Sequence, residues 1–119
     1  MTINAIAADP AFVSFDAANA GKPVLVNFVA SWCVPCRTLK PMIDDLAAHY
    51  REALACCRVD IEECPETAAR FDVKGVPTTM VLKDGAVLFR VLGTTSKTRL
   101  AMGIENALAK ALPVSGDVR

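Results

Sequence analysis

Apolar residues in this chain form short runs that alternate with stripes at helical spacing. The most continuous run, residues 24–30, is rich in β-branched and aromatic side chains, and Asn27 is its one polar member. Such a run is typical of a central strand that is covered on both faces. Residues 56–61 predict a second buried strand, and residues 3–7 predict a short strand at the edge of the sheet.

Four segments have the sequence signals of helices. Asp9 and Pro10 predict a helix start with Asp9 as the capping residue, because proline at the first helical position loses no hydrogen bond. Within residues 35–51, apolar side chains recur every three or four positions and form one stripe. Residues 65–71 predict a short helix, and residues 96–112 predict a longer one that closes the chain.

Two further strands are predicted over residues 79–83 and 87–92, joined by a tight turn at Asp84-Gly85. The order of elements is therefore β-α-β-α-β-α-β-β-α. This order predicts an α/β fold in which a mixed sheet has helices on both faces. Right-handed crossovers join the early strands, and the hairpin adds antiparallel strands.

The composition agrees with one folded domain. The 119 residues are 53% hydrophobic, which is more apolar than a disordered chain. No repeat or linker-like run divides them, so we expect one domain over residues 1–112 and a flexible tail over residues 113–119. Thirteen Lys and Arg balance thirteen Asp and Glu, so the net charge favours neither nucleic acid nor an anionic membrane as a partner.

Segment lengths and cysteine usage indicate the compartment. No apolar stretch approaches the roughly 18 residues that span a bilayer, and the amino-terminal segment lacks the features of a secretory signal. These observations predict a soluble protein of the cytoplasm. The five cysteines are odd in number, so at least one is outside any intramolecular disulfide. In a reducing compartment, cysteines are more often catalytic, metal-binding or buried than part of a disulfide framework.

Cys33 and Cys36 lie where the central strand ends and the long helix begins. A C-x-x-C pair at this place in a β-α-β pattern indicates redox chemistry, and two inert buried thiols are the alternative. Free backbone N–H groups at a helix start favour negative charge, so they stabilise the thiolate of Cys33. Cys36 follows one helical turn later, which brings the two sulfurs together and lets the pair alternate between dithiol and disulfide.

Several spaced motifs resemble the thioredoxin family over nearly the whole chain. They are Val24-Leu25-Val26-Asn27-Phe28, Trp32-Cys33-Val34-Pro35-Cys36, Pro41, Val59-Asp60-Ile61, Gly75-Val76-Pro77-Thr78, Asp84-Gly85 and Gly93. The resemblance implies the thioredoxin fold, a central mixed five-stranded sheet flanked by four helices. It also implies a protein-disulfide reductase in which Cys33 attacks the client and Cys36 resolves the mixed disulfide. We expect neither a cofactor nor a metal.

The resemblance also implies roles for residues around the two cysteines. In the family, the proline that matches Pro77 is cis and faces the cysteines, and the backbone of the preceding residue pairs with an extended client. An uncharged docking rim is then expected from Trp32, Val34, Pro35, Val76 and Gly93. The expected partners are client proteins that contain disulfides and a thioredoxin reductase as electron donor. We expect a monomer.

Some positions depart from the family pattern. Asn27 stands where thioredoxins usually have a buried Asp that helps to move the proton of the second cysteine. We therefore expect slower resolution by Cys36; alternatively, Asn27 only makes a buried hydrogen bond. Arg58, where the family often has Lys, lacks that Asp as a partner and is expected to extend to solvent. Val34 replaces the usual Gly and adds stiff apolar surface beside Cys33.

The remaining cysteines are Cys56, Cys57 and Cys64. Adjacent strand residues point to opposite faces, so Cys56 and Cys57 are expected to be buried and inert. Cys64 precedes Pro65 at a helix start. This place either lowers its pKa and makes it a regulatory thiol, or leaves it a weak cap without a role.

Two rival functions use the same residues. A zinc site could combine the C-x-x-C pair with Cys56 and Cys57, but adjacent cysteines lack the two-residue spacer that lets a pair close a tetrahedron. A specialised thiol carrier or client-binding module with weak general reductase activity is the closer rival, and Asn27 and Val34 motivate it.

Overall fold

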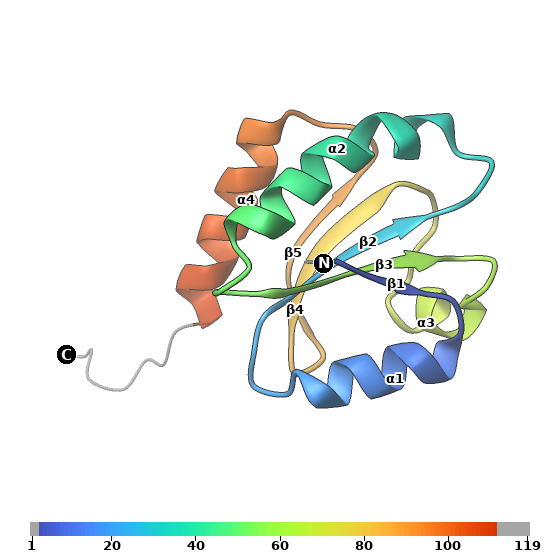
Figure 1. Ribbon diagram of the computed structural model, residues 1–119, viewed down its shortest axis with the longest axis horizontal. Helices are drawn as coiled ribbons and strands as arrows, with labels where there is room; N and C mark the ends of the chain where they lie inside the picture. Colours follow the sequence, from blue (N-terminus) through green and yellow to red (C-terminus); the bar gives the residue numbers. More distant parts are fainter. Residues whose placement is uncertain (1–2, 112–119) are drawn as a thin grey trace.

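A computed structural model describes residues 3–111 of the chain (Figure 1). Its elements in chain order are β1 (Asn4–Ile6), α1 (Asp9–Ala18), β2 (Val24–Val29), α2 (Val34–His49), β3 (Ala55–Asp60), α3 (Pro65–Arg70), β4 (Thr78–Lys83), β5 (Ala86–Leu92) and α4 (Lys97–Ala111). This order confirms the predicted one and the predicted fold class. Leu112 and the predicted tail over residues 113–119 lie outside the described residues. None of the described helices has the length and apolar character needed to cross a membrane.

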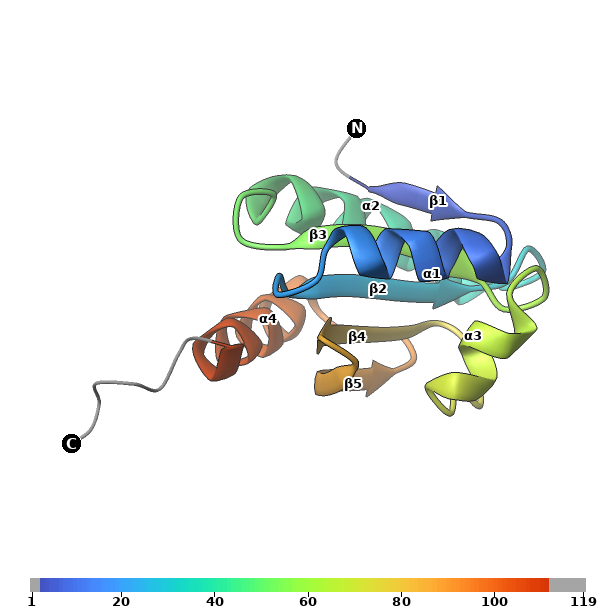
Figure 2. The ribbon, with the colours of Figure 1, turned by 90° about the horizontal axis from the view of Figure 1, so that it is seen from below.

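The sheet has the strand order β1-β3-β2-β4-β5, and Figure 2 shows the strands side by side in this order. Strands β1 and β2 both pair with β3 in parallel, whereas β4 pairs antiparallel with both β2 and β5. The predicted hairpin turn is present: Asp84 and Gly85 have φ angles of 50° and 86°. Positive φ at both central residues is what a tight hairpin turn of this handedness requires.

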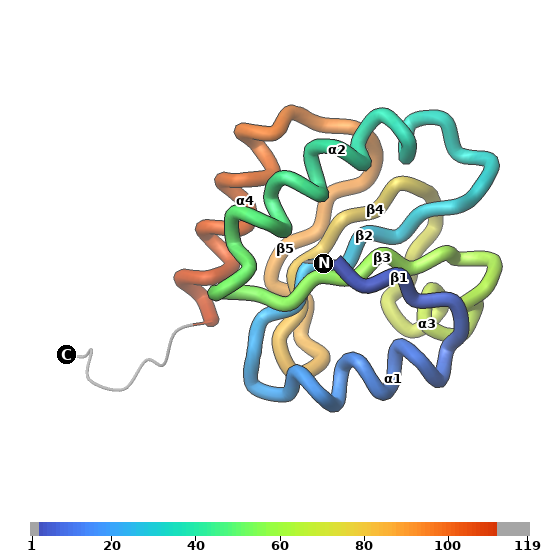
Figure 3. Tube along the Cα trace, in the orientation of Figure 1, coloured from blue at the N-terminus to red at the C-terminus, as the bar shows by residue number. Residues whose placement is uncertain are grey.

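Two separate cores form on the two faces of the sheet. Helices α2 and α4 cover one face and α1 and α3 cover the other, and the trace in Figure 3 shows the chain crossing between these faces. The core under α2 and α4 includes Leu25, Leu39, Ile43, Leu100 and Ile104. The core under α1 and α3 includes Phe12, Val26, Phe28, Val59 and Phe71. Alternate residues of β2 belong to opposite cores, as expected for a strand covered on both faces.

Three phenylalanine rings lie in the core under α1 and α3. The ring of Phe71 is edge-on to that of Phe12, with centroids 5.8 Å apart, and its centroid is 6.3 Å from that of Phe28. Phe12 and Phe28 are fully buried. Edge-on aromatic pairs are favoured beyond the area that they bury. The three rings therefore hold the central strand β2 against both helices of this face.

The predicted role of Asp9 as the cap of its own helix is wrong. The N-cap residue of α1 is Ala8, which makes no side-chain capping bond. The Asp9 carboxylate instead accepts hydrogen bonds from the N–H groups of Glu66 (3.2 Å) and Thr67 (2.7 Å) and from the Thr67 hydroxyl (2.6 Å). These bonds, that of the hydroxyl above all, hold the pKa of Asp9 below its ordinary value. Asp9 thus caps α3, whose own N-cap residue, Cys64, makes no capping bond.

Cys56 and Cys57 are buried free thiols in the two different cores, as predicted. Burial raises the pKa of Cys56 to about 12, and it also raises the pKa of Cys57. Cys64 is buried as well, and its thiol donates to the carbonyl of Ile6 at 3.6 Å. Burial and the nearby carboxylates raise the pKa of Cys64, so of the two alternatives for this residue the lowered pKa is wrong.

Candidate active site

The turn between β2 and α2 brings Cys33 and Cys36 together at one end of the sheet (Figure 1). The two residues form a disulfide, and their Cα atoms are 5.3 Å apart. Cys33 is the last residue before α2, and Cys36 lies in the first turn of that helix. The structure therefore shows the pair in its oxidised form, and addition of two electrons and two protons would convert it to the dithiol.

Cys33 is the N-cap residue of α2. Its backbone is extended (φ −89°, ψ 104°), and its Sγ atom accepts a hydrogen bond from the N–H of Cys36 at 3.1 Å. N–H groups in the first turn of a helix have no partner within the helix, and a cap residue normally satisfies one of them with a side-chain oxygen. Here the sulfur of Cys33 accepts that hydrogen bond in place of an oxygen. The same N–H is placed to stabilise a thiolate on Cys33 after reduction.

Exposure does not distinguish the two cysteines, because only 3% of the Cys33 residue and 6% of the Cys36 residue is accessible to solvent. The hydrogen bond does distinguish them, since only the sulfur of Cys33 accepts a helix N–H. Pro35, between them, has no N–H to contribute. The geometry therefore favours negative charge on Cys33 over Cys36.

Apolar side chains surround the disulfide. Those packed on it belong to Val29, Ala30, Ile61 and Val76. The peptide bond between Val76 and Pro77 is cis, as predicted. The carbonyl of Pro77 accepts a hydrogen bond from the N–H of Gly93 at 2.7 Å, which places Gly93 beside the cis bond.

The other expected rim residues lie at the surface. Trp32 is 60% exposed and Val34 is 62% exposed, and Pro35 between the cysteines is also exposed. The indole N–H of Trp32 donates to the carboxylate of Glu62 at 3.1 Å, which orients the ring toward the turn after β3. Trp32, Val34 and Pro35 are thus exposed residues that flank the two buried cysteines in the chain.

Two residues that lie next to expected rim residues were not predicted from the sequence. Leu92 is 63% exposed at the end of β5 and lies against Gly75, just before Val76. Its position at the end of a predicted strand, immediately before Gly93, could have indicated from the sequence that Leu92 lies next to the rim. The second residue is Glu62, the acceptor for Trp32. The only indication of it in the sequence was its place in the acidic stretch of Asp60 and two glutamates that follows a buried strand.

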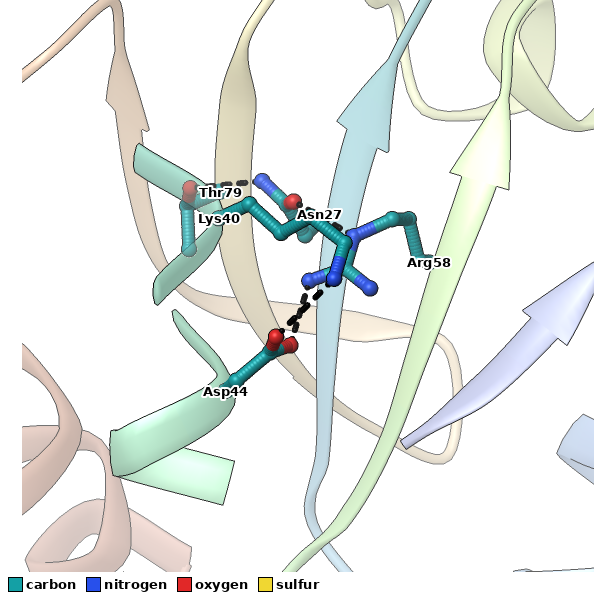
Figure 4. Close-up of polar contacts among 5 residues, drawn as sticks. All are labelled: Asn27, Lys40, Asp44, Arg58 and Thr79. Carbon is teal, nitrogen blue, oxygen red and sulfur yellow. Dashed lines mark hydrogen bonds and ion pairs between the residues drawn. The ribbon is translucent and has the colours of Figure 1, made fainter. Parts of the chain in front are cut away.

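A polar network lies between the sheet and α2, the helix that carries Cys36 (Figure 4). Asn27 of β2 pairs in register with Arg58 of β3 on one side and with Thr79 of β4 on the other. Its amide donates to Thr79 Oγ1 at 3.3 Å, and its carbonyl oxygen accepts from Arg58 Nε at 3.4 Å. Asn27 is only 1% exposed, so both of its polar groups are satisfied inside the protein.

The prediction that Arg58 extends to solvent is wrong. Its guanidinium forms an ion pair with Asp44 of α2 at 2.8 Å, and only 17% of its side chain is exposed. Asp44 also pairs with Lys40 one turn earlier, at 3.1 Å. Burial tends to raise the pKa of Asp44, but the hydrogen bonds from Arg58 and Lys40 outweigh it and hold this pKa below its ordinary value. The i, i+4 spacing of Lys40 and Asp44 was the one sequence signal for this network.

A cavity of about 170 Å³ connects this network with Cys36. Its lining residues are Val29, Ala30, Ser31, Cys36, Arg37, Lys40 and Arg58. A water molecule occupies about 30 Å³ in the liquid, so the cavity has room for several. Three of the lining side chains carry positive charge and none carries negative charge. The cavity beside Cys36 therefore carries a net positive charge, although part of its lining, such as Val29 and Ala30, is apolar.

Comparison with known proteins gives matches over most of the chain. The family profile described as Thioredoxin matches residues 7–106. The chain is 40% identical over 86 residues to Thioredoxin of Pseudomonas aeruginosa, which covers 72% of this chain and 80% of that protein. It is 37% identical over 86 residues to Thioredoxin 1 of Synechococcus elongatus, with the same two coverages. It is 41% identical over 83 residues to the chloroplastic Thioredoxin M-type of Triticum aestivum, and this match spans 70% of the chain but only 47% of that protein.

Proposed function

The chain belongs to the thioredoxin family, whose members are thiol–disulfide oxidoreductases, and we propose that it reduces disulfide bonds in client proteins. The observation that supports this function best is the Cys33–Cys36 disulfide at the start of α2, in which a helix N–H donates to the sulfur of Cys33. The fold holds both sulfurs at bonding distance. The pair can therefore open and close without a large backbone movement.

The reaction proceeds in two exchange steps. In the reduced protein, the Cys33 thiolate attacks one sulfur of the client disulfide, and the other client sulfur leaves as a thiolate that takes up a proton. Cys36 then loses its proton and attacks the sulfur of Cys33 in the mixed disulfide. The second client thiolate leaves and is protonated, and Cys33 and Cys36 are joined as seen here. Two electrons and two protons have passed to the client.

Clients dock on an uncharged rim around the disulfide in this proposal. Its members are Trp32, Val34, Pro35, Val76, Leu92 and Gly93. Their grouping supports the assignment, because Thr78 pairs with Phe28 on one side and with Leu92 on the other, which brings Leu92 to the sheet end where β2 leads to the cysteines. Exposed apolar surface of this kind is typical of protein interaction sites. The backbone of Val76 pairs with an extended segment of the client.

Electrons reach the pair from a thioredoxin reductase, and the protein acts as a monomer in the cytoplasm. Apart from the redox pair, Cys56, Cys57 and Cys64 are free thiols, which suits a compartment that keeps thiols reduced. The similarity to bacterial thioredoxins supports a thioredoxin reductase as the electron donor.

The function is tested by following insulin reduction in the presence of a bacterial thioredoxin reductase and NADPH. Insulin should precipitate as its chains separate, at a rate proportional to the amount of this protein. Precipitation with dithiothreitol but not with the reductase would favour the specialised carrier instead. Absence of precipitation with either reductant would refute the proposed activity.

Asn27→Asp should speed the second exchange step roughly tenfold at neutral pH. A well-placed general base contributes about 100-fold or more, but the new carboxylate would also pair with Arg58 and lose part of this effect. The rate is measured as the slower of the two phases in which the reduced protein reacts with 5,5′-dithiobis(2-nitrobenzoate). An added negative charge disfavours the Cys33 thiolate, so alkylation should give the variant a Cys33 pKa no lower than that of the unaltered protein. A lower value would contradict the prediction.

A further inference from the structure

On the basis of the proposed function, we propose that Arg90 of β5 is a positioning residue for client docking. Its guanidinium donates to the carbonyl groups of Phe71 and Asp72, where α3 ends. The chain continues from there to Val76, whose backbone pairs with the client. Arg90 thereby holds residues 71–77, which we call the docking segment, in the conformation that presents Val76.

Helix α3 ends in a turn that leaves carbonyl groups for an outside donor. Asp72 has a φ angle of 55°, in the left-handed region. The N–H groups of Asp72 and Val73 donate back into the last turn of α3, at 3.1 and 2.9 Å, which is a common way for a helix to end. The carbonyl groups of Phe71 and Asp72 accept from Arg90 instead, the second at 3.5 Å. The bonds of Arg90 therefore complete this helix end from a different element.

Strand β5 contacts the docking segment along its length. Arg90 holds its beginning, and Leu92, on the same face of the strand, lies against Gly75. The N–H of Gly93 donates to the carbonyl of Pro77 at 2.7 Å. Because β5 is itself paired with β4, these contacts fix the docking segment to the sheet.

The backbone of Val76 stays open between these contacts. The carbonyl of Gly75 accepts from the Thr78 hydroxyl at 2.6 Å, and that of Pro77 is taken by β5. Among residues 3–111, by contrast, the N–H and C=O groups of Val76 find no hydrogen-bond partner. Val76 is half-buried, so these groups are available to an extended peptide. Arg90 acts on them through the segment and not by contact.

Arg90 differs from two other cations near the docking segment because it binds the main chain. Lys74 pairs with Asp72 at 3.2 Å, but both side chains are more than three-quarters exposed, at 80% and 77%. Such a surface pair contributes little. Arg70 pairs with Asp16 of α1 at 3.8 Å. Hydrogen bonds from a charged donor to a carbonyl group are stronger than those between neutral groups, so Arg90 restrains the segment most.

The restraint affects docking and not the exchange chemistry. Arg90 gives up neither a proton nor an electron in the two exchange steps. A segment that is already ordered in the free protein loses less conformational freedom when the client binds, which favours binding. Loss of Arg90 should therefore weaken the docking of peptide clients. The reaction of Cys33 with a small disulfide that does not use Val76 should remain.

The test compares Arg90→Met, which keeps an apolar stem without donors, with Arg90→Lys, which keeps a charged donor. The reduced protein is mixed with excess insulin, and the rate of a single turnover is measured against insulin concentration. About 0.5 M NaCl screens long-range attraction between charges. Arg90→Met should raise the half-saturating insulin concentration about tenfold and change the limiting rate by less than about twofold. Arg90→Lys should recover most of this loss.

The matched substrate is 2,2′-dithiodipyridine, a neutral disulfide without a peptide backbone. Its rate of reaction with reduced Arg90→Met should lie within about twofold of the rate for the unaltered protein. The matched variant is Arg51→Met, because Arg51 also donates to a carbonyl at a helix end, that of Ala48 at 3.1 Å, at the end of α2 away from the cysteines. It should leave the half-saturating insulin concentration unchanged.

Amide hydrogen exchange shows whether the effect of the substitution is local. In Arg90→Met, exchange at Val73, whose N–H closes the end of α3, should be about tenfold faster, whereas exchange at Val81 in the buried strand β4 should not change. A general loss of stability would raise both. If Arg90→Met does not fold, Arg90→Thr replaces it, since a β-branched residue is favoured in a strand.

An unchanged half-saturating insulin concentration in the variant without donors would overturn the inference. So would equal losses with insulin and with the small disulfide, equal acceleration of exchange at Val73 and Val81, or an Arg90→Lys protein as poor as Arg90→Met. Failure of the proposed function looks different, because the unaltered protein itself would then not reduce insulin.

Discussion

Replacing Cys33 with serine should abolish the reduction of protein disulfides, with a loss of at least about 1000-fold in rate. A hydroxyl at the N-cap of α2 still accepts the N–H of Cys36, so the helix start remains satisfied. It cannot form an anion near neutral pH, however, and the first exchange step lacks its nucleophile. Insulin reduction with dithiothreitol as electron source measures the loss without depending on a reductase.

The matched variant, Cys36→Ser, keeps the nucleophile and removes the resolving thiol. It should accumulate as a mixed disulfide with the client, visible by mass spectrometry under non-reducing conditions. Cys64→Ser is the control for loss of a thiol elsewhere, since Cys64 is buried far along the chain from the pair, and it should keep full activity. Retention of activity by Cys33→Ser would show that another group carries the reaction.

Phe28→Ala should lower the free energy of unfolding by about 3–5 kcal/mol, the usual cost of removing a buried aromatic ring. A domain of this size is stable by only about 5–15 kcal/mol, so the change removes a large part of the total. Phe28 is fully buried on the central strand and contacts Phe71, and the sheet leaves no room for neighbouring strands to close the gap. Urea unfolding followed by circular dichroism gives the difference.

Phe15→Ala provides the comparison, because Phe15 lies at the margin of the same core and is only half-buried. Phe15→Ala should lower the free energy of unfolding distinctly less than Phe28→Ala does in the same experiment. Equal losses for the two variants would contradict the burial difference between these positions.

The order of elements could be predicted from the sequence because its signals are local. A continuous apolar run on β2, a helical stripe on α2 and Asp84-Gly85 at the hairpin each depend on neighbouring residues alone. The same holds for the candidate active site, since Cys33 and Cys36 are three positions apart on one helix start. Spacing along the chain is sufficient to place such pairs.

Features that depend on contacts between distant segments could not be read in this way. Local pattern assigns a long charged side chain such as Arg58 to solvent, but Asp44 reaches it from another element. A helix start favours a thiolate at Cys64, yet burial among carboxylates reverses the direction. Gly103 counts against a helix by propensity, but a Cβ atom there would overlap the ring of Phe89 on β5. In each case burial or a residue from another element decides the outcome.

The bond from Asp9 to the start of α3 has a consequence for the order in which the chain folds. A helix of six residues is too short to be stable alone, and the groups that need a cap at its start find it 58 residues earlier in the chain. During synthesis the acceptor emerges from the ribosome well before the donors that it will hold. Helix α1 therefore supplies the cap that completes α3, and this face of the sheet is fully covered only when both helices are in place.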